Sequence, residues 1–388
     1  MAGSRPSATQ NSANAAQMFV VRTPPKSTTR ASFGWVGFAL MAETEAIDGI
    51  DREGVESWFE RTVPGAELPL AFERIAGGRS NLTYGVTDAA GARWALRRPP
   101  MGKALGNAHD MGREHRVVSA LAPTPVPVPP VAGFCEDDSV NGAPFYVMDF
   151  VAGPILRQKP DAEPFSEDDR RAIGLRVVDT LVAIHAVQPD EVGLGELGRK
   201  EDYVARTLRR WHGQWEKSKT RDLGLVTEVH DRLAARIPDQ GPATIVHGDY
   251  RLDNMILAPS GDIAAVVDWE LCTLGDPLAD LGLLLVYWSE EGDELLPLFE
   301  PATMAPGFPT REEVKARYAE RSGRDLSLID FYLALGYWKL AIVLEGVFAR
   351  YAQGQYGKGG EKDEGMKTFA RTVERLVEAS DEAERRLG

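Results

Sequence analysis

Cysteine is scarce in this 388-residue sequence, and its scarcity limits the chemistry that the chain can carry. The two cysteines, Cys135 and Cys272, lie far apart and form neither a metal-ligand spacing nor a disulfide pattern. Disulfides are uncommon in reducing compartments, so two cysteines without a disulfide pattern are compatible with a reducing compartment. We therefore expect a cytoplasmic location.

Long apolar runs are also missing. No segment approaches the ~20 consecutive apolar residues that a bilayer-spanning helix needs, so we expect no membrane-spanning segment. The composition, with 43% hydrophobic and 26% charged residues, is ordinary for a globular protein. At this length the chain can form two lobes and bury a sizeable core.

Basic residues are outnumbered, which limits the partners. The chain has 44 Lys and Arg against 58 Asp and Glu, and its formal net charge is −14. Nucleic-acid binding needs a basic face, so we expect no nucleic-acid partner, whereas a cationic small molecule would be compatible. There is no Walker-A sequence, and the Gly-rich run 193–198 has the spacing of a dinucleotide fingerprint without the strand that should precede it.

Acidic residues are absent from residues 1–41, which differ from everything after them. Their few charged residues are basic, and the segment is rich in Ser, Ala, Thr and Asn. One interpretation is a targeting peptide, and the other is a translated upstream extension before a working start at Met41. In either case we expect disorder over 1–41.

The most informative stretch runs from Thr244 to Glu270. Short apolar runs alternate there with polar loops and a Gly-containing turn, which predicts a small hairpin with polar groups at both mouths. The apolar runs are residues 245–246, 255–257 and 263–267. Such a hairpin would bring Asp249, Asn254 and Asp268 close together.

These three side chains offer oxygen ligands, which Mg²⁺ prefers, and a sparse set of this type suits a nucleotide triphosphate that completes the metal shell. Taken singly, each of them is also an ordinary turn former. Their joint spacing is more specific: Asn254 follows Asp249 by five residues, and Asp268 follows Asn254 by fourteen, at a strand end. This order matches the phosphoryl-transfer template of one Asp at the acceptor hydroxyl and two metal ligands.

The run His247-Gly248-Asp249 through Asn254, followed by Asp268-Trp269-Glu270, resembles the aminoglycoside phosphotransferase family, small-molecule kinases that share the protein-kinase fold. The resemblance implies an α+β fold with two lobes, and it implies ATP and Mg²⁺ as cofactors. The N-terminal nucleotide-binding lobe, residues 42–150, would hold an antiparallel sheet and one main helix. The larger, mostly helical C-terminal lobe, residues 151–388, would hold the catalytic hairpin and the substrate.

Within this family pattern, Asp249 would be the catalytic residue, and Asn254 and Asp268 would hold the metal. Asp280, near the start of an apolar helix, resembles the family's structural Asp that braces the catalytic loop; as a plain charge at a helix start it would also be unremarkable. His185, near the end of an amphipathic helix, is better explained by a structural role.

The N-terminal half supplies the candidate nucleotide contacts. A Gly-rich turn between two predicted strands can cradle an anion with its N–H groups, although many such turns only reverse the chain. Its residues stand where the family places its phosphate-covering loop. They are Gly77, Gly78, Ser80 and Asn81.

The third predicted strand carries a departure from the wider family. Where kinases have a phosphate-binding Lys, this chain has Arg97, and Glu114 on the next helix would orient it. Arg keeps its charge and can bind phosphate bidentately, so the role survives in principle while geometry and turnover are put in question. The run Leu96-Arg97-Arg98-Pro99-Pro100 resembles the branch of the family that is associated with acyl-CoA dehydrogenases, which implies a functional link to such an enzyme.

An apolar strand that stops at Gly153-Pro154 predicts the boundary between the lobes. By resemblance this is the hinge, where backbone groups would bind adenine; a plain structural strand would show the same pattern. The candidate adenine-binding residues are Met148, Asp149, Phe150 and Val151.

The sequence leaves the acceptor open. The branch resemblance favours a hydroxyacyl group or another small metabolic alcohol, the family name suggests an aminoglycoside, and choline-like or sugar hydroxyls remain. The change to Arg97 also permits a nucleotide-binding regulator with little turnover. Candidate substrate-side residues, for which core packing is the competing explanation, are Trp288, Trp338, Lys339, Glu345, Arg350 and Tyr351.

Overall fold

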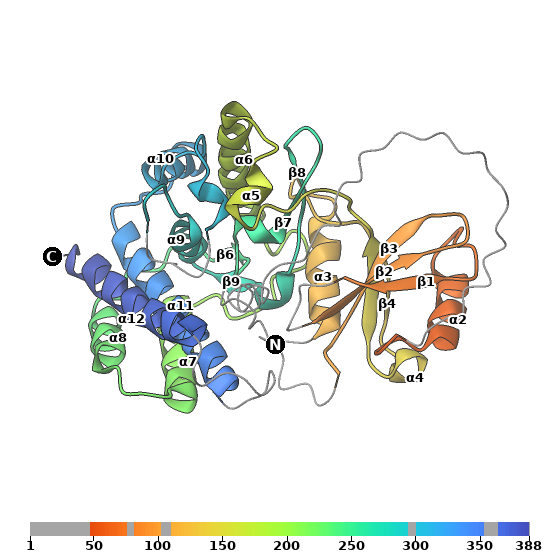
Figure 1. Cartoon of the computed structure of the whole chain (residues 1–388), viewed down its shortest axis with the longest axis horizontal. Coiled ribbons are helices and arrows are strands. Elements are labelled where there is room, and N and C mark those ends of the chain that lie inside the picture. Colours follow the sequence, from red (N-terminus) through yellow and green to blue (C-terminus); the bar gives the residue numbers. More distant parts are fainter. Residues whose placement is uncertain (1–46, 76–80, 102–109, 294–299, 353–363, 388) are drawn as a thin grey trace, which may run out of the picture. The chain divides into compact units, whose positions relative to one another are not determined.

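A computed structural model describes residues 47–75, 81–101, 110–293, 300–352 and 364–387. The chain forms two compact units, each described here by itself (Figure 1). Unit 1 comprises Met1–Gly112 and Val131–Phe150, and unit 2 comprises Arg113–Pro130 and Val151–Gly388. The predicted extension 1–41 lies outside the described residues.

Unit 1 is built on a five-stranded antiparallel sheet in the order β1-β2-β3-β5-β4. Its strands are β1 (Ala71–Arg74), β2 (Leu82–Thr87), β3 (Arg93–Arg98), β4 (Val131–Cys135) and β5 (Phe145–Asp149). Its helices are α2 (Arg52–Thr62) and the short α4 (Asp138–Asn141).

Both faces of this sheet carry buried apolar residues. Successive side chains of a strand point to opposite faces, so each strand contributes to both. Phe145 of β5 faces a core formed with α2, where its ring meets Trp58 edge to face at 4.9 Å. Tyr146 and Met148 point to the other face and form a smaller apolar cluster with Ala95. Alternation along β5 therefore fixes which residues reach each side.

Unit 2 is mostly helical, with two small sheets. Its helices are α3 (Met111–Leu121, which begins in unit 1), α5 (Lys159–Ala162), α6 (Glu167–Ala186), α7 (Tyr203–Ser218), α8 (Gly224–Ala235), α9 (Pro277–Tyr287), α10 (Arg311–Ser322), α11 (Ile329–Ala352) and α12 (Glu364–Arg385). The strands are β6 (Thr244–Val246), β7 (Met255–Leu257), β8 (Ile263–Val266) and β9 (Thr273–Gly275). Short 3-10 turns occupy Leu252–Asn254, Trp269–Leu271 and Ala302–Met304.

Helix α11 lies at the centre of unit 2, packed against α12, α9, α7 and α8 (Figure 1). Lys339 and Glu345 interrupt its apolar run, yet Ile329–Arg350 is long and apolar enough by composition to span a membrane. Its mean hydropathy is 1.4, and 72% of its most apolar stretch is buried inside the protein. Interior helices are apolar all round, so burial within the unit accounts for the composition.

Helix α3 differs from the predicted lobe division, which placed residues up to 150 in the N-terminal lobe. Residues 113–130 pack with unit 2. Two arginines explain this attachment: Arg113 donates to the carbonyls of Leu197 and Cys272 at 2.6 and 2.8 Å, and Arg116 donates to Gly193 at 2.6 Å.

Candidate active site

The stretch from Thr244 to Glu270 forms two strand pairs rather than one hairpin. β7 pairs with β8 as predicted, but β6 pairs with β9, which lies beyond Asp268 in the sequence. Strands of three residues carry little pattern of their own, and pairing over this distance leaves no local signal. The polar loop 247–254 thus connects two small sheets, and the return from β8 to β9 carries Asp268.

The buried carboxylate of Asp280 holds the start of the loop 247–254. Asp280 of α9 accepts the N–H groups of His247 at 2.6 Å and of Gly248 at 2.9 Å, and only 1% of its surface is exposed. Burial raises the pKa of Asp280, but the hydrogen bonds from His185 and from the Gly248 N–H outweigh it, so the net pKa lies below its usual range. Asp280 is therefore an ionised brace within the fold.

His185 completes this brace. Its ring lies between the Tyr318 hydroxyl, at 2.8 Å from Nδ1, and Asp280, at 3.5 Å from Nε2, and it is almost fully buried. Burial lowers the pKa of His185, although Asp280 acts in the opposite direction. These contacts assign His185 to support of the loop and not to chemistry.

The first residues of the loop are held in one conformation by close packing and hydrogen bonds. Gly248 has φ +85°, and a Cβ there would lie 2.8 Å from the carbonyl oxygen of Leu271. The ring of His247 is buried and spans the loop: Nε2 donates to the Val267 carbonyl at 3.1 Å, and Nδ1 accepts the Asp249 N–H at 3.3 Å. The backbone that presents Asp249 is thus fixed on both sides.

Asn254 connects the three predicted site residues. Its Nδ2 donates to the Asp249 carbonyl at 2.9 Å and to the Asp249 carboxylate at 3.1 Å. Its own backbone carbonyl accepts the N–H of Val267 at 2.9 Å, and Val267 directly precedes Asp268. The structure therefore brings Asn254 against Asp249 and against the segment that carries Asp268, as the sequence predicted.

Asp268 stands in an uncommon backbone conformation. Its φ of 69° and ψ of 55° lie in the left-handed region, which an Asp adopts more easily than most residues but which still has a cost. Non-glycine residues held in this region gather at functional sites, so the conformation is an independent reason to examine Asp268.

Arg251 and Asp253 form the other wall of the loop and were not predicted as site residues. Arg251 lies 3.6 Å from the Asp249 carboxylate and 3.5 Å from that of Asp253, and its guanidinium stands 4.8 Å from the ring centre of Tyr287. Burial lowers the pKa of Arg251, but the two carboxylates outweigh it and the net pKa is raised. A basic residue inside an acidic loop was the signal that sequence reasoning could have used.

The donor set fits a magnesium ion. Because the Asn254 amide nitrogen is engaged by Asp249, its oxygen is the atom left for a cation, next to the segment of Asp268. In the part of the chain that the structure describes, no cluster of three or more His, Cys, Asp or Glu side chains could hold a metal. Mg²⁺ needs no such cage, since it binds one or two carboxylates together with water and substrate phosphates.

The nucleotide candidates of unit 1 are only partly described. Gly77, Gly78 and Ser80 lie outside the described residues, while Asn81 is buried with 1% exposure just before β2. Arg97 is half-buried in β3, where it pairs with Thr83 and Tyr146.

Arg98 lies on the opposite face of β3 from Arg97. It is buried and donates to the carbonyls of Gly49 and Asn141. Arg98 is therefore a structural residue.

The hinge candidates end β5. Met148 belongs to the smaller apolar cluster, and Asp149 pairs with Trp94 and is exposed. Phe150 stacks beneath the Arg93 guanidinium, 3.9 Å from the ring centre, and donates its N–H to the Arg93 carbonyl at 3.2 Å. Val151 and Glu114 belong to unit 2, and Glu114 is buried on α3 with 2% exposure.

Several candidate substrate-side residues serve packing. Trp288 and Trp338 are buried and donate their indole N–H to the carbonyls of Pro309 and Val226 at 2.8 and 2.9 Å. Glu345 is fully buried and binds Thr220. Lys339 is different, because its ammonium reaches the loop 247–254.

The chain is similar to known proteins. Residues 71–319 match the sequence profile of the phosphotransferase enzyme family. Acyl-CoA dehydrogenase family member 11 of Gallus gallus is 33% identical over 353 residues, which cover 87% of this chain and 44% of that protein. The chain thus spans less than half the length of this relative.

Solved structures confirm the predicted two-lobed, protein-kinase-like α+β fold. A predicted aminoglycoside phosphotransferase of Ralstonia eutropha is 31% identical, with a TM-score of 0.72 over 86% of this chain and 99% of that one. A choline kinase of Cryptosporidium parvum has a TM-score of 0.61 at 12% identity, covering 86% of this chain and 96% of that one, which is a likeness of fold alone.

Proposed function

Because the chain belongs to the phosphotransferase enzyme family, we propose that it is an ATP- and Mg²⁺-dependent kinase that transfers the γ-phosphoryl group to a hydroxyl of a small molecule. One observation carries this proposal: Asn254 donates to Asp249 while its own carbonyl holds the strand end that leads to Asp268. In this proposal Asp249 supplies the carboxylate on the acceptor side and Asn254 and Asp268 supply two oxygen ligands, which is the set that phosphoryl transfer requires.

Asp249 is the group that faces the acceptor. Its carboxylate is 27% exposed, while its backbone is fixed by His247, so it can reach a bound hydroxyl without losing its orientation. The acceptor oxygen forms a bond to the γ-phosphorus, the bond from that phosphorus to the β-bridging oxygen breaks, and ADP leaves. Asp249 accepts the hydroxyl proton late in this step.

Asn254 and Asp268 would hold the magnesium ion, which when bound neutralises the developing charge on the phosphates. In unit 1, Arg97 would bind the α and β phosphates, with Glu114 as the residue that orients it, and the loop 77–81 would cover them. The backbone at 149–151 would bind adenine, beside Met148 and Phe150.

We propose a hydroxyacyl group or another small metabolic alcohol as the acceptor. The relative named acyl-CoA dehydrogenase family member 11 supports this class, and a functional link to such a dehydrogenase follows from the same likeness. An aminoglycoside is the second candidate, since the Ralstonia eutropha protein carries that name. Two free, buried cysteines are compatible with a reducing, cytoplasmic compartment, which we retain as a proposal.

The test is phosphoryl transfer itself. The protein is incubated with ATP and Mg²⁺ and pooled hydroxyacyl thioesters, hydroxylated metabolites and aminoglycosides, and mass spectrometry records the gain of one phosphoryl group. Asp249→Ala is the active-site variant. Asp262→Ala is the matched control, because Asp262 lies in the β7–β8 turn and pairs with Arg176, away from the loop.

We expect one pool to yield a product that Asp262→Ala still forms and that Asp249→Ala forms about 10²- to 10⁴-fold more slowly. Equal rates in wild type and Asp249→Ala would overturn the mechanism. Tight ATP binding without any product would instead favour a nucleotide-binding regulator, the reading that Arg97 leaves open.

A further inference from the structure

Lys339 stands in the middle of α11, a helix whose remaining central residues are mostly apolar and buried. A lysine in such a setting usually extends its ammonium to the surface. This one instead donates from Nζ to the backbone carbonyl of Gly248 at 2.8 Å. Lys339 is half-buried, and its ammonium is directed toward the interior of unit 2, where an unpaired charge would be costly.

The carbonyl that it binds belongs to the peptide between Gly248 and Asp249. The N–H of the same peptide donates to His247, and the preceding N–H, that of Gly248, donates to Asp280. Lys339 therefore supplies the third fixed contact on the two peptides that lead into Asp249. Without it, the peptide carbonyl next to Asp249 would lose its recorded protein donor.

The charges around the ammonium come from several elements. Asp249 of the loop and Asp280 of α9 favour its charged form, whereas burial and Arg210 of α7 oppose it, and the net pKa of Lys339 is lowered, with burial the largest cause. The Trp211 ring lies 5.7 Å away and provides a further favourable contact. The ammonium thus interacts electrostatically both with Asp280, which supports the loop, and with Asp249, the proposed catalytic residue.

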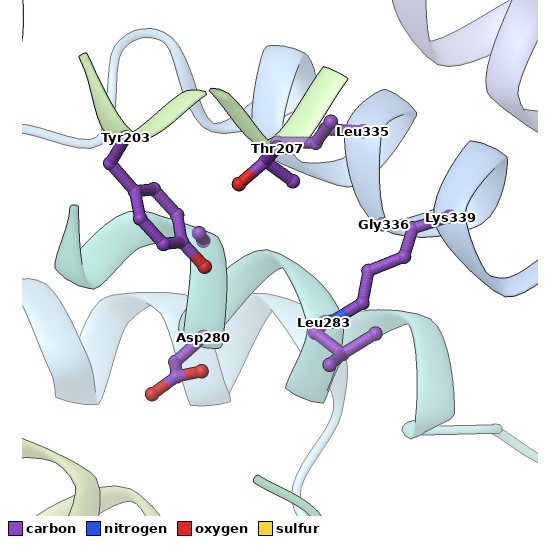
Figure 2. A pocket seen from close by; sticks show the side chains of 8 residues that line it. Tyr203, Thr207, Asp280, Leu283, Leu335, Gly336 and Lys339 are labelled. Carbon is purple, nitrogen blue, oxygen red and sulfur yellow. The ribbon is translucent and has the colours of Figure 1, made fainter. Parts of the chain in front are cut away.

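A small cavity lies beside this side chain, between α7, α9 and α11 (Figure 2). Tyr203 and Thr207 of α7 point their hydroxyls toward it, and Lys339 crosses it from α11 toward Leu283. The lining residues are Tyr203, Thr207, Ala279, Asp280, Leu283, Leu335, Gly336 and Lys339.

We propose that Lys339 is a positioning residue for phosphoryl transfer, which holds the Gly248–Asp249 peptide so that the Asp249 carboxylate is aimed at the acceptor hydroxyl. This inference rests on the proposed kinase function for its catalytic consequence. Its structural content, an ordered loop at 247–254, does not depend on the identity of the acceptor. A shift of about 1 Å in a reacting group can cost about 10²-fold in rate, so a single backbone contact can matter.

The experiment compares Lys339→Met, which removes the donor at similar length, with Lys339→Arg, which keeps a cationic donor at this position. Lys315→Met is the control, since Lys315 lies on α10 and pairs with Glu312. Each variant is measured for kcat, for KM of ATP and of the acceptor, and for hydrogen exchange of the peptide covering 247–254.

We expect Lys339→Met to lower kcat by about 10- to 100-fold with little change in the KM for ATP, and to speed exchange in the loop. Lys339→Arg should keep most of the wild-type kcat and most of the protection of the loop from exchange. Lys315→Met should resemble wild type. A folded Lys339→Met with wild-type kcat and loop exchange overturns the proposal. If Lys339→Met does not fold, unrestored kcat and fast loop exchange in a folded Lys339→Arg overturn it.

The two proposals fail in different ways. An inactive wild type with every acceptor would count against the kinase, while loop exchange in the same variants would still decide whether Lys339 orders the loop. An active wild type with an indifferent Lys339→Met would leave the kinase intact and reject the positioning role.

Discussion

Replacing Asp280 with Asn tests the physical basis of the catalytic loop most directly. Each carboxylate oxygen accepts one backbone N–H: Oδ2 that of His247 and Oδ1 that of Gly248. An amide has only one acceptor oxygen, so whichever way it turns, its NH₂ group faces an N–H and a buried donor loses its partner. The change keeps the size of the side chain and removes only acceptor capacity and charge.

The magnitude follows from those contacts. A charge-assisted hydrogen bond contributes about 1.5–3 kcal/mol, and an unsatisfied buried donor costs about 1–3 kcal/mol, so we expect a loss of about 3–5 kcal/mol in the free energy of unfolding of unit 2. A domain has only about 5–15 kcal/mol in total, so the transition should shift visibly in denaturant. Turnover should fall as well, because Gly248 directly precedes Asp249.

The effect should also depend on pH. The pKa of Asp280 in the folded chain lies below its usual range. A carboxyl with a depressed folded pKa stabilises the protein above its unfolded pKa, about 3.9, and this contribution disappears as the pH falls through the folded value. The difference in unfolding free energy between wild type and Asp280→Asn should therefore be largest near neutrality and shrink below about pH 4.

Asp276→Asn is the matched control. Asp276 caps α9 through the Leu278 N–H and accepts the Tyr332 hydroxyl, away from the loop. A hydroxyl can reverse its role and accept from an amide, and Asn caps helices about as well as Asp, so this change should cost little. If denaturation with circular dichroism places Asp280→Asn within about 0.5 kcal/mol of wild type, the brace argument is wrong.

Three further changes probe other parts of unit 2. Asn254→Ala should raise the Mg²⁺ concentration needed for half-maximal turnover by about 10- to 100-fold, since it removes a proposed ligand that Asp249 orients; an unchanged Mg²⁺ titration would exclude Asn254 from the metal. Arg113→Met should lower the free energy of unfolding by about 1–3 kcal/mol, because two carbonyls lose their donor, and chemical denaturation measures it. Thr310→Ala should cost about 1 kcal/mol by loss of the α10 capping box. Because Arg171 and then Thr310 lower the pKa of Glu313 to about 2, the stabilisation by Glu313 should be present above about pH 4.3 and lost as the pH falls toward 2 in thermal melts.

The sequence predicted those features that have a local cause. Ser166 and the acidic residues after it are a local signal for a helix start, and the structure has a capping box there with Asp169 at the start of α6. The spacing of Asp249, Asn254 and Asp268 predicted their neighbourhood, because a turn and a short strand pair leave few ways to arrange them.

Features set by distant partners were not predicted. Nothing in residues 273–275 marks a strand, and β9 forms because β6 offers its free edge. Arg97 and Arg98 look alike in sequence, yet alternation in β3 sends Arg98 to Gly49 and Asn141.

The role of Lys339 in the apolar helix α11 was not predicted either. The sequence predicts that Lys339 is a substrate-side or core residue. In the structure its ammonium binds the carbonyl of Gly248, which is 91 residues away in the sequence.

In the proposed mechanism, the residues that support the loop differ from the residue that reacts, so the loop can be ordered before any ligand binds. Asp280, His185 and His247 are buried and bind groups of the protein, so their orientation owes nothing to substrate. Asp249 stays partly exposed on a backbone that they hold. A preorganised carboxylate needs no rearrangement when the phosphoryl group moves, and such preorganisation is the main source of rate in phosphoryl transfer. Variants of the buried residues should therefore lose stability and turnover together, whereas variants of Asp249 should lose turnover alone.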